Sequence, residues 1–317
     1  MASPTPPTHA LPHGVTVFER GWLSSNNVLL VDGERAALVD TGYCTHAEQT
    51  LALVAKALPD RPLDLVLNTH LHSDHCGGNA ALQSHYPELV TAIPPGSAQA
   101  VADWDEDKLG YRALGQSMVS YIFHKVLHPG STERLAGLTW EIHAAPGHDP
   151  HAVLLFEPAS RTLISGDALW QNGFGVVFPE LEGESGYGEV SDTLDLIEHL
   201  RPTTVIPGHG AVFAGVPQAL AVARQRLEGF VAQPERHTRH AAKVLLKYKL
   251  LELGRTTPDA LLAWACATPM LTLLHRQSAA PATTHSAADF AAWVDGVVAD
   301  LVRAGAAVHT ETEIFNA

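Results

Sequence analysis

Four side chains that can bind a metal ion stand within six consecutive residues, the segment His-Leu-His-Ser-Asp-His at positions 70–75. His70 and His72 are two positions apart, so in extended backbone both project to the same side and can chelate one ion. Asp74 and His75 follow as a second pair at a different angle, which suits a second ion. Imidazole and carboxylate groups are ligands for zinc or a similar divalent metal. The segment therefore predicts a metal centre.

Three further candidate ligands, His148, Asp167 and His209, lie downstream. Asp167 and His209 each follow a short aliphatic run that ends in a turn with glycine. His148 follows the run at 140–145 and a Pro-Gly turn. Ligands placed at strand ends on rigid supports are how a sheet enzyme builds an open metal site. We expect these three residues to complete the centre.

The seven residues resemble, in order and context, the dinuclear signature of the metallo-β-lactamase-fold hydrolase superfamily. The matching contexts include Gly77 and Gly78 after the first motif and the Pro-Gly-His-Gly segment at 207–210. The resemblance covers roughly residues 15–215. It implies that one ion is held by His70, His72 and His148. It also implies that the second is held by Asp74, His75 and His209, with Asp167 bridging the two.

Asp40, in the Val-Asp-Thr-Gly segment at 39–42, matches another element of this family. The resemblance implies that its carboxylate lies behind the ligands and orients a histidine ring through the free ring N–H. The alternative is that Asp40 only forms the turn at the end of a strand.

Two neighbouring divalent ions can share a hydroxide and polarise a substrate oxygen. We expect this bridging hydroxide to attack the carbonyl of a small carboxylic ester or thioester, with Asp74 orienting it and taking its proton. Zinc is the expected metal, two ions per chain, and iron or manganese are the alternatives because the same ligands accept them. Asp167 and the Pro-Gly-His-Gly ending resemble glyoxalase II-type hydrolases, whereas β-lactamases of this fold carry Cys or Ser at the Asp167 position. The competing hypotheses are a phosphodiesterase or ribonuclease of the same fold and a low-turnover metal-binding regulatory protein.

Aromatic residues follow Asp167 on a glycine-rich stretch at 168–188. Such groups suit an apolar or acyl substrate. The residues expected to line a substrate pocket, unless they pack a domain interface instead, are Trp170, Phe174, Phe178 and Tyr187.

Short apolar runs predict strands near 15–18, 27–31, 35–39, 63–67, 89–93, 138–144, 152–157, 162–165 and 203–207. Helical periodicity appears at 45–58, 74–86 and 190–200. The resemblance implies an αββα sandwich over residues 15–215, after a flexible tail at 1–14. Residues 94–132 carry two predicted helices, near 97–104 and 115–127, and either cover the active site or pack against the sheet edge.

From residue 216 helices are expected at 217–231, 236–253, 259–267, 271–274 and 287–304, followed by a β-ribbon from 307. This order resembles the small winged-helix-like domain appended to some superfamily members, here residues 216–317. Four basic residues form one face of its second helix, which is either solvated or near a bound anion: Arg236, Arg239, Lys243 and Lys247. Residues 235–317 carry equal numbers of basic and acidic side chains, so a lid or dimerisation element is favoured over a DNA reader.

The whole chain of 317 residues carries a formal net charge of −14, which disfavours nucleic acid and anionic membranes as partners. No apolar run is long enough to span a bilayer, and the first residues do not form a secretory signal. Three cysteines without close pairing indicate a reducing compartment. We therefore expect a cytoplasmic protein with a small-molecule substrate, and the sequence leaves homo-oligomerisation open.

Overall fold

Two mixed β-sheets form the centre of the molecule in the computed structural model, which describes residues 11–33, 35–278 and 286–317. The first sheet has the order β1-β2-β3-β4-β5-β6 and consists of Val15–Phe18, Asn27–Val31, Ala36–Val39, Leu65–Leu67, Val90–Ile93 and Lys125–Val126. The second has the order β11-β10-β9-β8-β7 and consists, in that order, of Thr204–Pro207, Thr162–Gly166, Val153–Glu157, Leu138–Ala144 and Thr132–Leu135. Strands β3 to β6 run parallel, as do β10 and β11.

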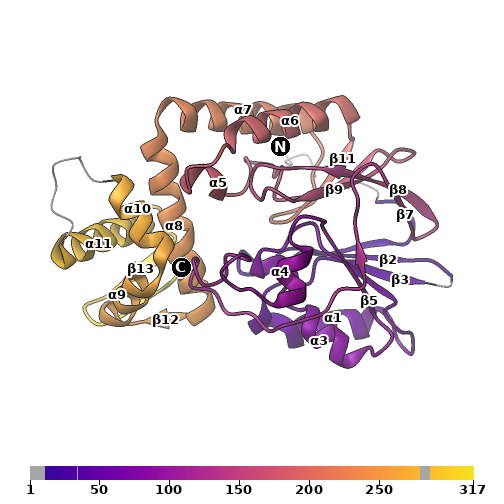
Figure 1. Cartoon of the computed structure of the whole chain (residues 1–317), viewed down its shortest axis with the longest axis horizontal. Helices are drawn as coiled ribbons and strands as arrows, with labels where there is room; N and C mark the ends of the chain where they lie inside the picture. Colours follow the sequence, from indigo (N-terminus) through magenta and orange to yellow (C-terminus); the bar gives the residue numbers. More distant parts are fainter. Residues whose placement is uncertain (1–10, 34, 279–285) are drawn as a thin grey trace, which may run out of the picture.

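The two sheets pack face to face, with helices on both outer surfaces (Figure 1). Leu30 of β2 belongs to the core between the sheets with Trp140 of β8, whereas its neighbour Leu29 packs against Val54 of α1. This alternation is the period-2 pattern of a strand covered on both faces. The covering helices are α1 (Ala47–Ala57) and α3 (Asn79–His85) on the first sheet, and α6 (Tyr187–Leu200) and α7 (Val216–Ala232) on the second. The predicted αββα sandwich is confirmed.

The C-terminal region is helical, as predicted, and its helices share a hydrophobic core to which Leu114, Val176 and Leu181 also belong. Its helices are α8 (Pro234–Leu253), α9 (Pro258–Ala267), α10 (Pro269–Ser278) and α11 (Ala287–Arg303). The predicted ribbon is β13 (Ala307–His309) paired with β14 (Ile314–Asn316), and β12 (Arg255–Thr256) extends it. None of the described helices combines the length and apolar character that crossing a bilayer requires.

The packing suggests different domain limits from those drawn on the sequence. The buried side chains of α7, such as Leu220 and Ala223, join the core beneath the second sheet, so we propose that the helical unit begins with α8. At the other end, Leu11 packs against the core between the sheets. Of the tail expected at 1–14, residues 1–10 lie outside the described residues.

The segment between β5 and β7 departs from prediction. Helix α4 (Ala98–Asp103) matches the first expected helix, but the helix expected at 115–127 is wrong. There, Ile122 N donates to Gln83 Oε1 of α3 and His124 N to Thr91 O of β5, so contacts to α3 and β5 replace helical hydrogen bonds. The segment also docks on the C-terminal helices, because Met270 N of α10 donates to Ala113 O at 3.0 Å.

The helix predicted at 74–86 is divided in two, α2 (Ser73–Cys76) and α3, by Gly77 and Gly78. A Cβ at Gly77 would lie 2.4 Å from the backbone nitrogen of Cys44. The two glycines therefore allow the metal-binding segment to pack closely on the loop after β3.

Candidate active site

The seven predicted ligands lie at one edge of the sandwich, just beyond the strands that precede them. The segment at 70–75 follows β4 and ends in α2, and His148 follows β8. Asp167 directly follows β10, and His209 follows its parallel neighbour β11. Because parallel strands bring their carboxyl ends to the same edge, side chains far apart in sequence meet there.

These side chains converge into three overlapping groups, in each of which one ligand atom per residue lies within 4.8 Å of the others. The groups are His70, His72 and His148; His70, His75 and Asp167; and Asp74, His75 and His209. Asp167 lies between the first and last groups. Its Oδ2 is 3.5 Å from Nε2 of His148 and its Oδ1 is 3.4 Å from Nε2 of His75.

Hydrogen bonds on the far side of two rings leave lone pairs aimed at the centre. His75 Nδ1 donates to Asp40 Oδ2 at 2.7 Å, and His148 Nδ1 donates to the carbonyl oxygen of Val176. In the neutral form of either ring the single proton is on Nδ1, so the Nε2 lone pair is available to a metal ion. The buried Nε2 atoms of His70 and His75 have no hydrogen-bond partner. Such an unsatisfied atom costs about 1–3 kcal/mol, which a divalent cation at the centre would remove.

The electrostatics of the cluster also fit bound cations. Burial lowers the pKa of both His72 and His148 to about 4, so these rings are neutral at pH 7 and able to ligate. Burial also disfavours charge on His75, but the carboxylates of Asp167, Asp40 and Asp74 outweigh it and raise the pKa of His75 well above its usual range. The carboxylates thus attract positive charge to this point.

The Asp40 carboxylate accepts hydrogen bonds from the segment that carries the predicted ligands. Besides His75, it accepts hydrogen bonds from Thr69 N to Oδ1 and from Thr69 Oγ1 to Oδ2, both at 2.8 Å. Its backbone is left-handed, with φ 59°, a conformation that costs a non-glycine residue about 1 kcal/mol or more. Asp40 therefore does more than end a strand, because its carboxylate ties β3 to the metal-binding segment.

Two glycines permit the close packing of ligands. A Cβ on Gly208 would lie 2.2 Å from Asp167 Oδ1, and a Cβ on Gly175 would lie 2.4 Å from His148 Nδ1. Both distances are far below van der Waals contact, so any larger residue would displace the ligand. This explains the glycine in the Pro-Gly-His-Gly segment.

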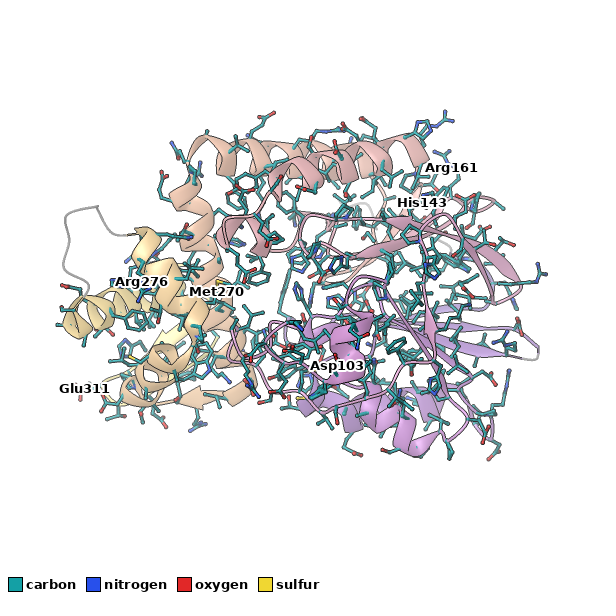
Figure 2. The ribbon with its side chains drawn as sticks, viewed as in Figure 1. Asp103, His143, Arg161, Met270, Arg276 and Glu311 are labelled. Atoms are coloured by element: carbon teal, nitrogen blue, oxygen red, sulfur yellow. The ribbon has the colours of Figure 1, made fainter. Side chains whose placement is uncertain are left out.

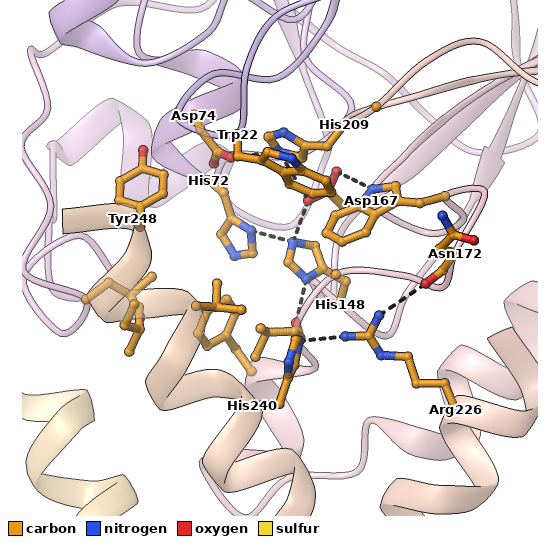
Figure 3. Close-up of a pocket in the computed structure, with 18 of the residues that line it drawn as sticks. Trp22, His72, Asp74, His148, Asp167, Asn172, His209, Arg226, His240 and Tyr248 are labelled. Carbon is orange, nitrogen blue, oxygen red and sulfur yellow. Dashed lines mark hydrogen bonds and ion pairs between the residues drawn. The ribbon is translucent and has the colours of Figure 1, made fainter. Parts of the chain in front are cut away.

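A cavity of about 360 Å³ opens in front of the cluster (Figure 3). Its floor includes His72, Asp74, His148, Asp167 and His209. The walls come from separate parts of the chain: Trp22, residues 114–116, residues 170–178, Gly210 and Ala211, and the helices α7 and α8. The segment between β5 and β7 therefore does both things considered for it, since Leu114 and Gln116 line the cavity while β6 pairs with β5 at the edge of the first sheet.

The sequence matches the family model described as the metallo-beta-lactamase superfamily over residues 20–209, more than half of the chain. The chain belongs to the metallo-β-lactamase superfamily. Members of this superfamily bind metal ions, in keeping with the His and Asp cluster.

Named superfamily relatives include enzymes of ester and thioester cleavage. The chain is 31% identical over 181 residues to a hydroxyacylglutathione hydrolase of Synechococcus sp., covering 55% of this chain and 58% of that protein. It is 27% identical over 202 residues to the thioesterase pkgB of Emericella nidulans, covering 62% of this chain and 49% of that protein. The chain thus spans about half the length of these two relatives.

Solved structures show the same fold. A metallo-beta-lactamase family protein from Thermus thermophilus superposes with a TM-score of 0.55 at 19% identity, covering 97% of this chain and all of that one. The protein TTHA1623, crystallised in a di-iron-bound form, gives a TM-score of 0.53 at 25% identity, covering 66% of this chain and 98% of that one.

The four aromatic residues predicted for the pocket of this superfamily member divide into two pairs. Trp170 and Phe178 lie on the cavity wall. Phe174 and Tyr187 do not, which corrects the expectation for both. Phe174 is buried in the core beneath the second sheet, and the Tyr187 hydroxyl accepts from His237 Nδ1 at 3.0 Å.

Four cavity residues escaped the sequence analysis: Trp22, Arg226, His240 and Tyr248. Trp22 is 55% exposed and stacks on the His209 ring, with centroids 5.3 Å apart and planes 9° apart. Tyr248 of α8 contacts the metal-binding segment, its hydroxyl 3.2 Å from Ser73 Oγ. No local motif marks any of them.

The predicted basic face of α8 does not reach the cavity. Arg239 pairs with Asp300 of α11 at 2.7 Å, and Lys247 donates to the carbonyl oxygen of Ala306. These two contacts hold the C-terminal unit together, whereas Arg236 of the same face is exposed to solvent.

Proposed function

We propose that this chain is a dinuclear metal-dependent hydrolase that cleaves carboxylic ester or thioester bonds of small molecules. The convergence of five imidazoles and two carboxylates carries the proposal, because three of these imidazoles and both carboxylates form the floor of one cavity. The ester and thioester hydrolases among the relatives support the bond type.

In this proposal His70, His72 and His148 would hold one ion, Asp74, His75 and His209 would hold the other, and Asp167, which lies between the two groups, would contact both. When bound, two such ions supply an acidified water as nucleophile and positive charge for the developing oxyanion, at neutral pH. Zinc is the expected metal, with iron and manganese as alternatives.

The protein's own groups position the reaction. Asp74 lies on the cavity floor, where its carboxylate can accept the proton of an attacking water and return it to the leaving group. Asp40 keeps the His75 ring in one tautomer through the bond to Nδ1. The largely apolar walls, with Trp170 and Phe178, exclude bulk water from an acyl group bound there.

A metal and substrate survey tests the proposal. Metal content would be measured by mass spectrometry, and turnover on p-nitrophenyl esters, acyl thioesters, lactones and bis-p-nitrophenyl phosphate would be compared with and without EDTA. We expect about two ions per chain and ester or thioester cleavage that EDTA abolishes and added zinc, manganese or iron restores.

The His72→Ala variant should lose turnover and about one ion per chain. His143→Ala is the matched control, because His143 is a partly exposed histidine of β8 remote from the cavity (Figure 2). Fewer than one ion per chain, with no turnover on any metal, would refute the dinuclear hydrolase. Cleavage of the phosphodiester alone would assign the chain to the phosphodiesterase branch instead.

A further inference from the structure

One arginine on the cavity wall has no carboxylate partner among the residues that the structure describes. Arg226 of α7 extends its guanidinium into the cavity between Asn172 and His240 (Figure 3). Its Nη2 donates to His240 Nε2 at 2.6 Å, whereas Nη1 is 3.5 Å from the carbonyl oxygen of Asn172, which is long for a hydrogen bond. Most of the five guanidinium N–H donors are thus left without a strong acceptor.

Two other arginines of the chain, Arg224 and Arg20, are better satisfied. Arg224, two residues earlier on α7, pairs with Asp195 at 2.7 Å and with Glu198 at 2.8 Å. Arg20 also lacks an acidic partner, but three neutral side-chain oxygens accept from its guanidinium. Burial lowers the pKa of Arg226, which shows that its charge is unfavourable where it lies. An anion in the cavity would offset this cost.

Aromatic rings and a loop pack against the guanidinium of Arg226, which also lines the cavity. Phe174 and Phe230 each have their ring centroid 5.4 Å from its Cζ, so aromatic rings pack against the guanidinium. A Cβ on Gly173 would lie 2.4 Å from Nη1, so the loop passes directly against it. Because His240 accepts through Nε2, its ring is neutral and orients the arginine without adding charge.

We propose that Arg226 binds a carboxylate of the substrate, so that the natural substrate is an ester or thioester of a carboxylate-bearing compound. This inference rests on the proposed hydrolase function and specifies its substrate class. Arg226 is the only Lys or Arg among the described residues that line the cavity, so the site matches a single negative charge better than a phosphate dianion. The planar fork of a guanidinium also fits a carboxylate in bidentate geometry.

The loop keeps Arg226 close to the cluster. Arg226 packs on Gly173 and His148 packs on Gly175, two residues further along. The two glycines are at most about 7 Å apart, so we expect a short spacer between the bound carboxylate and the reacting bond. The test substrates therefore have short acyl and thiol groups.

The test compares substrates matched in length on the intact metal-loaded protein. In the first pair, S-glutaryl N-acetylcysteamine has a carboxylate on its acyl side, and S-pentanoyl N-acetylcysteamine is its neutral match. In the second pair, S-pentanoyl 3-mercaptopropionate has a carboxylate on its thiol side, and S-pentanoyl propanethiol is its neutral match. We expect the wild type to prefer the charged member of one pair, measured as kcat/KM. In Arg226→Met this preference should fall about 10- to 100-fold, the range for one charged hydrogen-bonded pair, and Arg226→Lys should fall between them.

Arg224→Met is the matched control, because Arg224 lies on the same helix and pairs with exposed acids outside the cavity. It should keep the wild-type preference. The inference would be overturned if Arg226→Met lowered kcat/KM equally for charged and neutral substrates. It would also be overturned if the wild type did not prefer the charged member of either pair.

A binding measurement separates this inference from the hydrolase proposal. Calorimetric titration of the purified protein with pentanoate and with 1-pentanol needs no turnover. We expect pentanoate to bind at least about tenfold more weakly to Arg226→Met than to the wild type, with 1-pentanol affected less. If no substrate is cleaved but this difference is found, the hydrolase proposal fails and the carboxylate site stands. Equal binding of pentanoate to both proteins would refute the site.

Discussion

Replacement of Asp40 by asparagine should weaken both the fold and the metal centre. Asparagine tolerates the left-handed backbone at this position, so the substitution adds little strain. Its amide can still accept from Thr69 N with one oxygen. The NH₂ group, however, then faces His75 Nδ1, which donates to Asp40 Oδ2 at 2.7 Å in the native chain. Two donors would meet, and His75 must turn or shift its proton to Nε2, the atom that faces the centre.

The loss of this charged hydrogen bond is about 1.5–3 kcal/mol. For a chain of this size about 1 kcal/mol corresponds to about 2 °C, so the melting temperature should fall by about 3–6 °C. Metal affinity should fall about 10- to 100-fold, as is typical when the partner of a ligating histidine is removed.

Chelator competition and calorimetry of the same preparations measure both effects. Asp60→Asn is the control, because Asp60 is exposed and has nearly the same backbone, φ 58°. The Asp60→Asn variant should have the metal affinity and the melting temperature of the wild type within experimental error. If Asp40→Asn also keeps the wild-type affinity within twofold and melts within about 1 °C of it, Asp40 does not orient His75 and the reasoning is refuted.

Two further predictions follow from packing and burial. In Gly208→Ala, the new Cβ would lie 2.2 Å from Asp167 Oδ1 in the native geometry, so kcat should fall about 100-fold or more while circular dichroism shows an intact fold; wild-type kcat would contradict the role of this glycine. His237 uses both ring nitrogens, towards Val177 N and the Tyr187 hydroxyl, and burial lowers its pKa to about 4. The unfolded chain, with a histidine pKa of about 6.5, therefore binds more protons, and urea unfolding should show stability falling as the pH drops from about 6.5 to about 4. In His237→Gln this part of the pH dependence should be smaller, and an unchanged slope would show that His237 does not contribute.

Local patterns predicted the elements whose surroundings are regular. The side chains of strand β2 alternate between two hydrophobic cores, and the buried residues of α6 lie on one face. The spacing of apolar residues in the sequence was therefore enough to locate both elements. The helix expected at 115–127 failed because its apparent period had no matching surface to pack on. Tyr43 Oη accepts from Ser117 N, and Gln83 and Thr91 accept from Ile122 N and His124 N, all from residues distant in sequence.

The sequence by itself determined the likeness to the superfamily, the sandwich and the choice of the seven cluster residues, because each depends on residue types beside a strand end. Only the tertiary structure decided what faces the cavity. Arg224 and Arg226 are both arginines of α7 two positions apart, yet one pairs with surface acids and the other lines the cavity. Residues two apart on a helix point about 200° from each other, and only the packing of α7 against α8 and the loop at 170–178 determines which side is the wall.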